Sequence, residues 1–289
     1  MKVLKSNYFK GFVFSFLSAF LYGLNVPIAK YYLNVLSSSS LLFLLYLGST
    51  IGMFIILLGY KKHLVFTLSK IKIIYLVGVI ICDIIASLLI VSSLNYLNAS
   101  VVSLLSIFEI AATVIASKIV FKNKINKNLI ISLICVSIGG ILLSFDGDSE
   151  FKFSLAILFV LGATLLWGFE NNFTAKVSED NPILLVFCKC LFVTLFNLII
   201  LFISTNSLAI IFDYWYLLII GFFTYGVSIL FFAYGTKYIG ASKTSIIFSL
   251  SPIFSTFLSL IIFKENLNFL FIISFIFMLC GMFFNMKDT

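Results

Sequence analysis

Two segments of the chain, 142 residues apart, repeat one pattern and decide the fold. Residues 96–122 read YLNASVVSLLSIFEIAATVIASKIVFK, and residues 238–264 read YIGASKTSIIFSLSPIFSTFLSLIIFK. Both begin with Tyr and an Ala-Ser pair, both end in Phe-Lys, and both are otherwise mainly apolar, with scattered hydroxyl residues and few charged ones. A membrane-spanning helix takes about 20 apolar residues. The pattern therefore predicts a membrane helix that occurs twice.

The composition of the whole chain excludes a water-soluble domain. Of the 289 residues, 62% are hydrophobic and 10% are charged, and the mean hydropathy is +1.20. Soluble domains are about 45–50% apolar and about 25% charged. Disorder is excluded as well, because it requires low hydrophobicity and high charge. We expect an all-α polytopic membrane protein with ten transmembrane helices, near residues 9–32, 41–60, 71–94, 98–121, 126–145, 152–175, 182–204, 213–235, 239–263 and 266–286.

The internal repeat extends to both halves of the chain. Leu21-Tyr22-Gly23 resembles Leu166-Trp167-Gly168, so the first predicted helix corresponds to the sixth. Each half then holds five helices, with residues 1–145 as the first repeat and 146–289 as the second. Because five is odd, the second repeat enters the membrane in the opposite direction, and carriers with such inverted repeats bind substrate near the midplane between the halves. The alternative is a chance match between helices built from few residue types.

The lysines predict the orientation in the membrane. All 19 basic residues are lysine, so no guanidinium group is available for phosphates or guanine edges, and we expect no nucleic-acid partner. Most loop lysines fall on the side that holds both termini and the loops at 61–72 and 122–127. Since cytoplasmic loops carry an excess of lysine, we expect a multi-pass protein of the inner (cytoplasmic) cell membrane with both termini in the cytoplasm.

These features resemble the drug/metabolite transporter superfamily, of the EamA type, over roughly residues 10–286. The resemblance is carried by Trp167–Asn172 and Thr174-Ala175-Lys176 in the sixth helix, and by Ser251-Pro252 and Phe263-Lys264-Glu265 in the ninth. The first half departs from the family pattern, with Glu109-Ile110 at the Ser251-Pro252 position and Asn123 at the Glu265 position. The resemblance implies ten helices from a duplicated five-helix unit, and transport of a small metabolite such as an amino acid or similar amphipathic solute by alternating access.

Four ionisable residues lie inside the predicted helices, namely Asp83, Glu109, Glu170 and Lys189. A charge near the bilayer centre costs at least about 2.5–3.5 kcal/mol, so such residues are functional candidates. Glu109 and Asp83 lie near the middle of the fourth and third helices, and two carboxyl groups in one cavity would either couple transport to protons or bind a substrate amine. Glu170 and Lys189 lie at similar depth. They form an ion pair, or Lys189 extends toward the membrane surface.

Polar residues near these charges complete the predicted substrate site. The fourth helix places Ser103, Ser106 and Thr113 in one stripe with Glu109, and the ninth helix repeats the stripe with Ser245 and Ser249. Close helix packing is the alternative role for the serines.

The sixth and first helices add further candidates. Trp167, Glu170 and Asn171 share a face of the sixth helix. Asn25 is a candidate because Asn25-Val26-Pro27, like Ser251-Pro252, predicts a helix break at Pro27 or Pro252 with freed carbonyl groups, or else a mere kink.

No catalytic, metal or cofactor site is predicted. All five cysteines lie inside apolar runs, the lone histidine lies in a lysine-rich loop, and no HExxH, GxSxG or Walker motif occurs. A membrane-embedded enzyme and a non-transporting sensor or scaffold are the alternatives to a transporter. An enzyme would need a catalytic cluster, and a sensor or scaffold would need a sizeable loop or tail, and we expect neither from this sequence. We expect a small-molecule substrate and membrane lipid as partners, and leave proton coupling and oligomeric state open.

Overall fold

A computed structural model describes residues 2–60, 70–121, 127–143, 155–204, 208–265 and 269–286, and these residues form helices and connecting turns without a strand. Eight helical segments are long and apolar enough to cross a membrane, and they run over Asn7–Tyr32, Ser38–Gly59, Lys72–Ser93, Ala99–Ile119, Leu155–Ser178, Pro182–Ile203, Tyr216–Ile239 and Lys243–Phe263. The predicted all-α chain with several membrane-spanning helices is thus confirmed for these residues. The remaining two predicted spans correspond to the shorter helices near residues 127–143 and 269–286.

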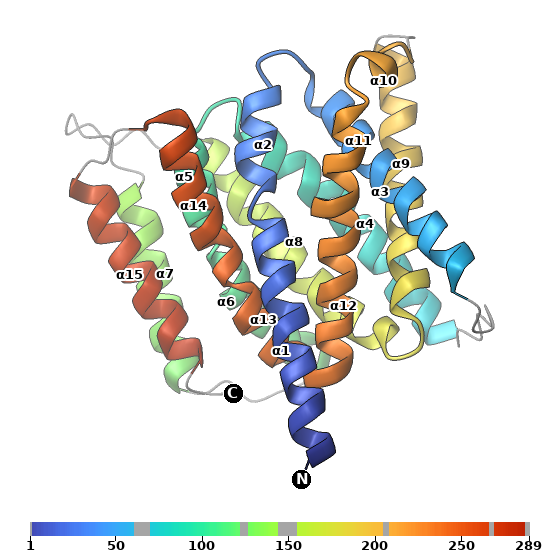
Figure 1. The fold of residues 1–289 in the computed structure, drawn as a ribbon. Helices are drawn as coiled ribbons and strands as arrows, with labels where there is room; N and C mark the ends of the chain where they lie inside the picture. The colour runs from blue at the N-terminus through green and yellow to red at the C-terminus, as the bar shows by residue number, and fades with distance from the viewer. Residues whose placement is uncertain are drawn as a thin grey trace.

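The helices follow one another in the order shown in Figure 1. The first half contains α1 (Lys2–Tyr22), α2 (Asn25–Tyr32), α3 (Ser38–Gly59), α4 (Lys70–Ser93), α5 (Ala99–Leu105), α6 (Phe108–Phe121) and α7 (Lys127–Leu143). The second half contains α8 (Leu155–Ser178), α9 (Pro182–Ser204), α10 (Ile210–Asp213), α11 (Tyr216–Gly221), the π-helical segment η1 (Phe222–Val227), α12 (Ser228–Ile239), α13 (Ala241–Phe248), α14 (Leu250–Phe263) and α15 (Phe269–Met286).

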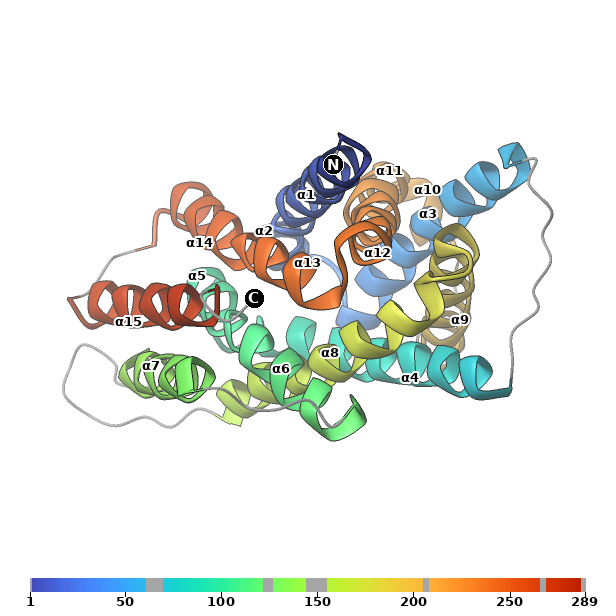
Figure 2. The same ribbon diagram turned by 90° about the horizontal axis from the view of Figure 1, so that it is seen from below.

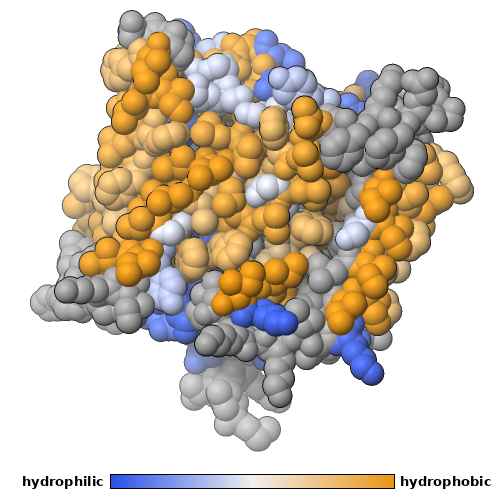
Figure 3. All heavy atoms as spheres, turned by 180° about the vertical axis from the view of Figure 1, so that it is seen from behind, coloured by the Kyte–Doolittle hydropathy of each residue, from blue (hydrophilic) through white to orange (hydrophobic). Residues whose placement is uncertain are grey.

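The outer surface suits a lipid environment. In Figure 3 apolar side chains cover the middle of the visible face, and the polar residues collect toward its ends. Many large apolar side chains are exposed, among them Ile74 at 69% and Ile203 at 80%. Exposing so many apolar side chains would be costly in water but is favourable in hydrocarbon.

Two of the helix breaks occur where proline removes a backbone donor. Pro27 is the third residue of α2, and Pro252 is the third residue of α14. A continuous helix would need the missing N–H groups to bond back to residues 23 and 248, and the breaks fall at residues 23–24 and at residue 249. In the first turn of a new helix the missing donor costs little. The breaks near Asn25-Val26-Pro27 and Ser251-Pro252 are therefore as expected.

A third break was not predicted and lies between α5 and α6. Sequence reasoning expected one helix over 98–121, but the chain turns at Ser106 and Ile107. There the amide groups of Glu109 and Ile110 bond to carbonyls three residues back, and the Ser106 hydroxyl donates to the Val102 carbonyl at 2.8 Å. Serine hydroxyls that bond in this way bend helices, so a break forms without proline.

The helices pack in pairs around a central region. Figure 2 shows α1, α12, α8, α6 and α13 around the middle of the molecule, with α7 and α15 side by side at one edge. The helix α4 packs along α8, α1 along α12, and α3 along α9.

Two glycines allow the central helices to approach closely. A Cβ atom on Gly168 would come within 2.6 Å of the Ala112 backbone on α6. A Cβ atom on Gly23 would lie 2.9 Å from Phe254 on α14. These contacts hold the adjoining Tyr22 and Trp167 at the centre of the molecule.

Candidate functional site

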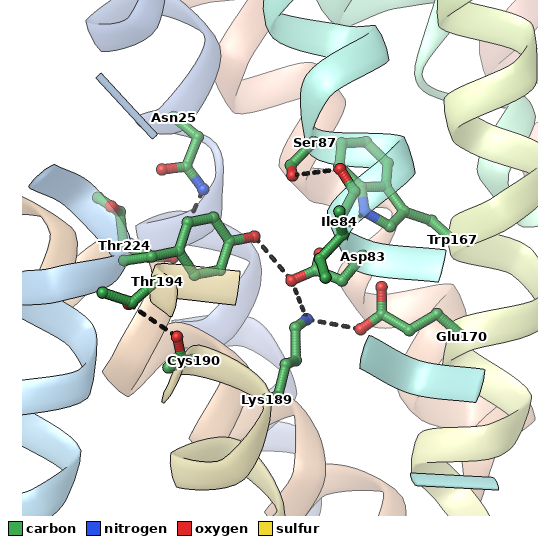
Figure 4. A network of polar contacts seen from close by, with 11 residues as sticks. Asn25, Asp83, Ile84, Ser87, Trp167, Glu170, Lys189, Cys190, Thr194 and Thr224 are labelled. Atoms are coloured by element: carbon green, nitrogen blue, oxygen red, sulfur yellow. Dashed lines mark hydrogen bonds and ion pairs between the residues drawn. The ribbon is translucent and has the colours of Figure 1, made fainter. Parts of the chain in front are cut away.

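A buried lysine lies between two carboxylates from neighbouring helices. The side chains of Lys189 on α9, Asp83 on α4 and Glu170 on α8 point toward one another in Figure 4. Lys189 Nζ is 3.3 Å from Asp83 Oδ2 and donates a hydrogen bond to Glu170 Oε1. Lys189 is only 2% exposed, so its ammonium group ends inside the protein and does not extend to the membrane surface.

Two aromatic side chains donate hydrogen bonds to the Asp83 carboxylate. The Tyr46 hydroxyl donates to Asp83 Oδ2 at 2.7 Å, and the Trp167 indole N–H donates to Oδ1 at 3.4 Å. We refer to Asp83, Lys189 and Glu170 as the ion triad. Because buried charges need both a counter-charge and hydrogen bonds, the triad joins α4, α8 and α9 firmly, and loss of Lys189 would leave two buried carboxylates without a cation.

Glu109 on α6 has a different environment. Asn171 on α8 donates from Nδ2 to Glu109 Oε1 at 2.8 Å and to Thr113 Oγ1 at 3.2 Å. Its neighbour Asn172 donates to the Thr113 carbonyl at 2.8 Å and so fixes α8 against α6. Among the described residues no lysine lies within 4.0 Å of the Glu109 carboxylate. Glu109 therefore has an amide partner but no cation.

Three cavities meet at Glu109. The distal cavity lies toward α2 and α5, away from the chain termini, and holds about 490 Å³ of empty space including its open part. The proximal cavity lies toward α12 and holds about 340 Å³ on the same measure, and a side cavity between α6, α13 and α14 holds about 230 Å³. Glu109 lines all three.

An aromatic layer separates the distal from the proximal cavity. Tyr22 and Trp167 line both cavities, and their rings meet edge to face with centroids 6.0 Å apart. The ring centroid of Tyr225, on the distal side, lies 6.2 Å from that of Tyr22. The ring centroid of Phe248, on the proximal side, lies 5.1 Å from that of Tyr22. Such packed ring pairs are stable contacts, so these rings form a packed layer at the boundary of the two cavities.

The structure brings most of the predicted site residues to these cavities. Asn25, Ser103 and Ser106 line the distal cavity, while Thr113, Ser245, Ser249 and Pro252 line the side cavity. Trp167, Glu170, Asn171 and Lys189 line the proximal cavity. The Ser103 hydroxyl also bonds to Ser255 at 2.7 Å across the α5–α14 contact, so this serine serves helix packing as well.

Two predicted residues lie elsewhere. Asp83 is 1% exposed and does not line the three cavities, because Tyr46, Lys189 and Trp167 surround its carboxylate. The expectation that Asp83 and Glu109 face one cavity thus does not match this arrangement. A similar position along neighbouring helices does not determine which neighbour a side chain meets. Pro27 is buried in the first turn of α2 and acts on the backbone alone.

Several residues of the site escaped sequence reasoning. Tyr22 could have been found, since it aligns with Trp167 in the internal repeat, and the two rings meet at the centre. The repeat gave no such indication for Tyr46, Tyr225 and Phe248, and composition could not single them out in a chain with 13 tyrosines and 35 phenylalanines. Among the described residues no group of three or more His, Cys, Asp or Glu side chains is placed to hold a metal ion.

Comparison with known proteins agrees with this architecture. The model of the EamA-like transporter family matches residues 9–145 and 154–287. No curated protein matches the chain. One solved crystal structure superposes with a TM-score of 0.70 at 13% identity, covering 96% of this chain and 95% of the other. At that identity the likeness shows the fold alone.

Proposed function

Since the chain belongs to the EamA-like transporter family, we propose that it carries a small amphipathic solute, such as an amino acid or a similar metabolite, across the cell membrane by alternating access. The observation that carries the proposal is that Glu109 borders both the distal and the proximal cavity, with the aromatic layer between them. A solute at Glu109 would reach one side or the other as this layer rearranges.

The proposed framework is ten transmembrane helices in two inverted repeats, residues 1–145 and 146–289. Helix pairing supports it, because α4 packs on α8 in the same way that α12 packs on α1, and α6 contacts α8 as α14 contacts α1. The glycine contacts follow the same rule. Gly23 approaches Phe254, and Gly168 approaches Ala112, the residue that corresponds to Phe254 in the first repeat because it lies 142 residues before it. The helices α7 and α15 would be the fifth and tenth crossings. The repeat boundary at residue 145 lies outside the described residues.

The proposed orientation places both termini in the cytoplasm. The first turn of α1 and the last turns of α12 and α15 lie at the same end of the molecule in Figure 1, and Lys237 is in the last turn of α12. Residues 61–69 and 122–126 of the predicted cytoplasmic loops lie outside the described residues. On this orientation the distal cavity faces the outside and the proximal cavity faces the cytoplasm.

Cysteine accessibility tests alternating access without a known substrate. In a background with all five cysteines replaced, we would introduce Val26→Cys in the distal cavity or Ile229→Cys in the proximal cavity. An impermeant maleimide should label Val26→Cys from outside and Ile229→Cys from the cytoplasmic side. Ile74→Cys is the control, because its 69% exposed side chain should face lipid and stay unlabelled by a reagent that reacts in water.

Two results would contradict the proposal. Labelling of Ile229→Cys from outside, with Val26→Cys protected, would reverse the orientation. Labelling of both positions from one side only would indicate a one-sided pocket without alternating access.

A further inference from the structure

Negative charge predominates at the centre of the protein. Asp83, Glu109 and Glu170 are opposed there by one cation, Lys189. That cation already contacts both Asp83 and Glu170, and the whole chain contains no arginine. A charge in hydrocarbon is expensive unless it is paired, so an ionised Glu109 needs a cation, and among the described residues no lysine lies within 4.0 Å of its carboxylate.

We propose that Glu109 binds the ammonium group of an organic amine that carries no acidic group, and that the apolar part of the amine lies in the distal cavity. This inference rests on the proposed transport function. It narrows the solute bound at the same site to amines, and it excludes the amino acids that the proposed function gives as an example.

The hydrogen-bonding groups around Glu109 suit an ammonium ion. Asn171 occupies Oε1 of Glu109, and among the described residues no hydrogen bond ends on Oε2. Ser245 lines the side cavity beside Glu109, is 7% exposed, and its buried hydroxyl has no partner among the described residues. An ammonium group has three N–H donors and no acceptor. It could donate to Glu109 Oε2 and to the Ser245 hydroxyl, which would satisfy both.

The walls of the cavities suit an amphipathic cation. Tyr22 and Trp167 border Glu109 with ring faces and edges that can contribute cation–π attraction. The distal cavity also has an aliphatic part of its lining, with Val26, Ile90 and Val91 among its residues, beside hydroxyl groups such as those of Ser251 and Ser255. A polar ammonium end and an apolar body would thus each meet a matching surface.

The same surroundings disfavour a carboxylate or phosphate group on the solute. The distal and side cavities have no lysine among their lining residues in the described part of the chain. The proximal cavity has Lys189, whose ammonium group is shared by two carboxylates. An anionic group near Glu109 would therefore lose its hydration and meet negative charge.

Tryptophan fluorescence can test the proposal directly. The chain has two tryptophans, Trp167 at the site and Trp215, which is 59% exposed on the surface. A Trp215→Phe variant leaves Trp167 as the single indole reporter. The purified full-length variant would be titrated at neutral pH with phenethylamine, phenylalanine and phenylacetate, which share a benzyl group but differ in charge.

The proposal predicts a saturable change in Trp167 emission with phenethylamine, and binding at least about tenfold weaker for phenylalanine and phenylacetate. Adding Glu109→Gln should weaken phenethylamine binding at least about tenfold. Glu179→Gln is the same substitution at an exposed residue, and it should leave phenethylamine binding unchanged.

Each other outcome overturns the inference. Equal or tighter binding of phenylalanine or phenylacetate would show that acidic groups are accepted. Unchanged amine binding in Glu109→Gln would move the site elsewhere. No response to millimolar phenethylamine, together with a pH-dependent Trp167 emission that Glu109→Gln abolishes, would show that Glu109 takes a proton only. None of these results would affect the cysteine-labelling test of alternating access.

Discussion

The ion triad and Glu109 contain the same chemical group in two different settings. Asp83 and Glu170 share the Lys189 cation, and Asp83 also accepts from Tyr46. Glu109 has one amide partner and borders three cavities. Buried acids that contact a cation mainly hold helices together, whereas an acid without a cation is available for a ligand. The difference assigns a structural role to the triad and a binding role to Glu109.

The largest expected effect is the loss of the triad's cation. Lys189→Met should lower the free energy of unfolding by about 3–5 kcal/mol, because two buried carboxylates lose their partner. Thermal unfolding of the purified protein in detergent would measure this loss. Adding Asp83→Asn and Glu170→Gln to Lys189→Met should recover part of the stability. If Lys189→Met melts at the wild-type temperature, the triad is not a buried ion network.

A smaller effect is expected from opening the aromatic layer. Tyr22→Ala removes the ring contacts to Trp167 and Phe248. Large-to-small changes of a buried residue cost about 2–5 kcal/mol, and we expect the low end because Tyr22 borders existing cavities. The variant should also leak small solutes from proteoliposomes faster than wild type. Tyr22→Phe keeps the ring and should stay tight, and an equal leak in both variants would contradict a closing role for the ring.

The smallest effect concerns the turn between α4 and α5, away from both acidic regions. Lys30 Nζ donates to the Leu94 and Leu97 carbonyls in the turn after α4, and Glu265 accepts from the Ala99 and Ser100 amides at the start of α5. Such capping contacts contribute about 1 kcal/mol each. Glu265→Gln should therefore lower the unfolding temperature slightly and leave amine binding intact. A loss as large as that of Lys189→Met would mean that the turn, too, is part of the structural core.

The fold was more predictable from the sequence than the site. Long apolar runs separated by lysine-rich segments gave the helices, and proline marked two of the three breaks. The break at Ser106 and Ile107 was missed because it depends on backbone bonds that no single residue type announces.

Within the site, the individual polar residues were predictable because polarity inside an apolar helix is conspicuous. Their partners were less predictable. Whether Lys189 reaches Asp83 or the membrane surface depends on how α9 is rotated against α4, and that rotation is set by packing among distant segments. Tyr22 is the exception, since the repeat pairs it with Trp167.

One variant, Glu109→Gln, tests most directly whether Glu109 binds the solute while the triad holds the structure. It would be assayed for phenethylamine uptake into proteoliposomes and for its unfolding temperature. The account predicts that uptake falls to the level of empty liposomes, while the unfolding temperature stays within about 3 °C of wild type because no ion pair is broken. Uptake at the wild-type rate, from protein that melts at the wild-type temperature, would contradict it.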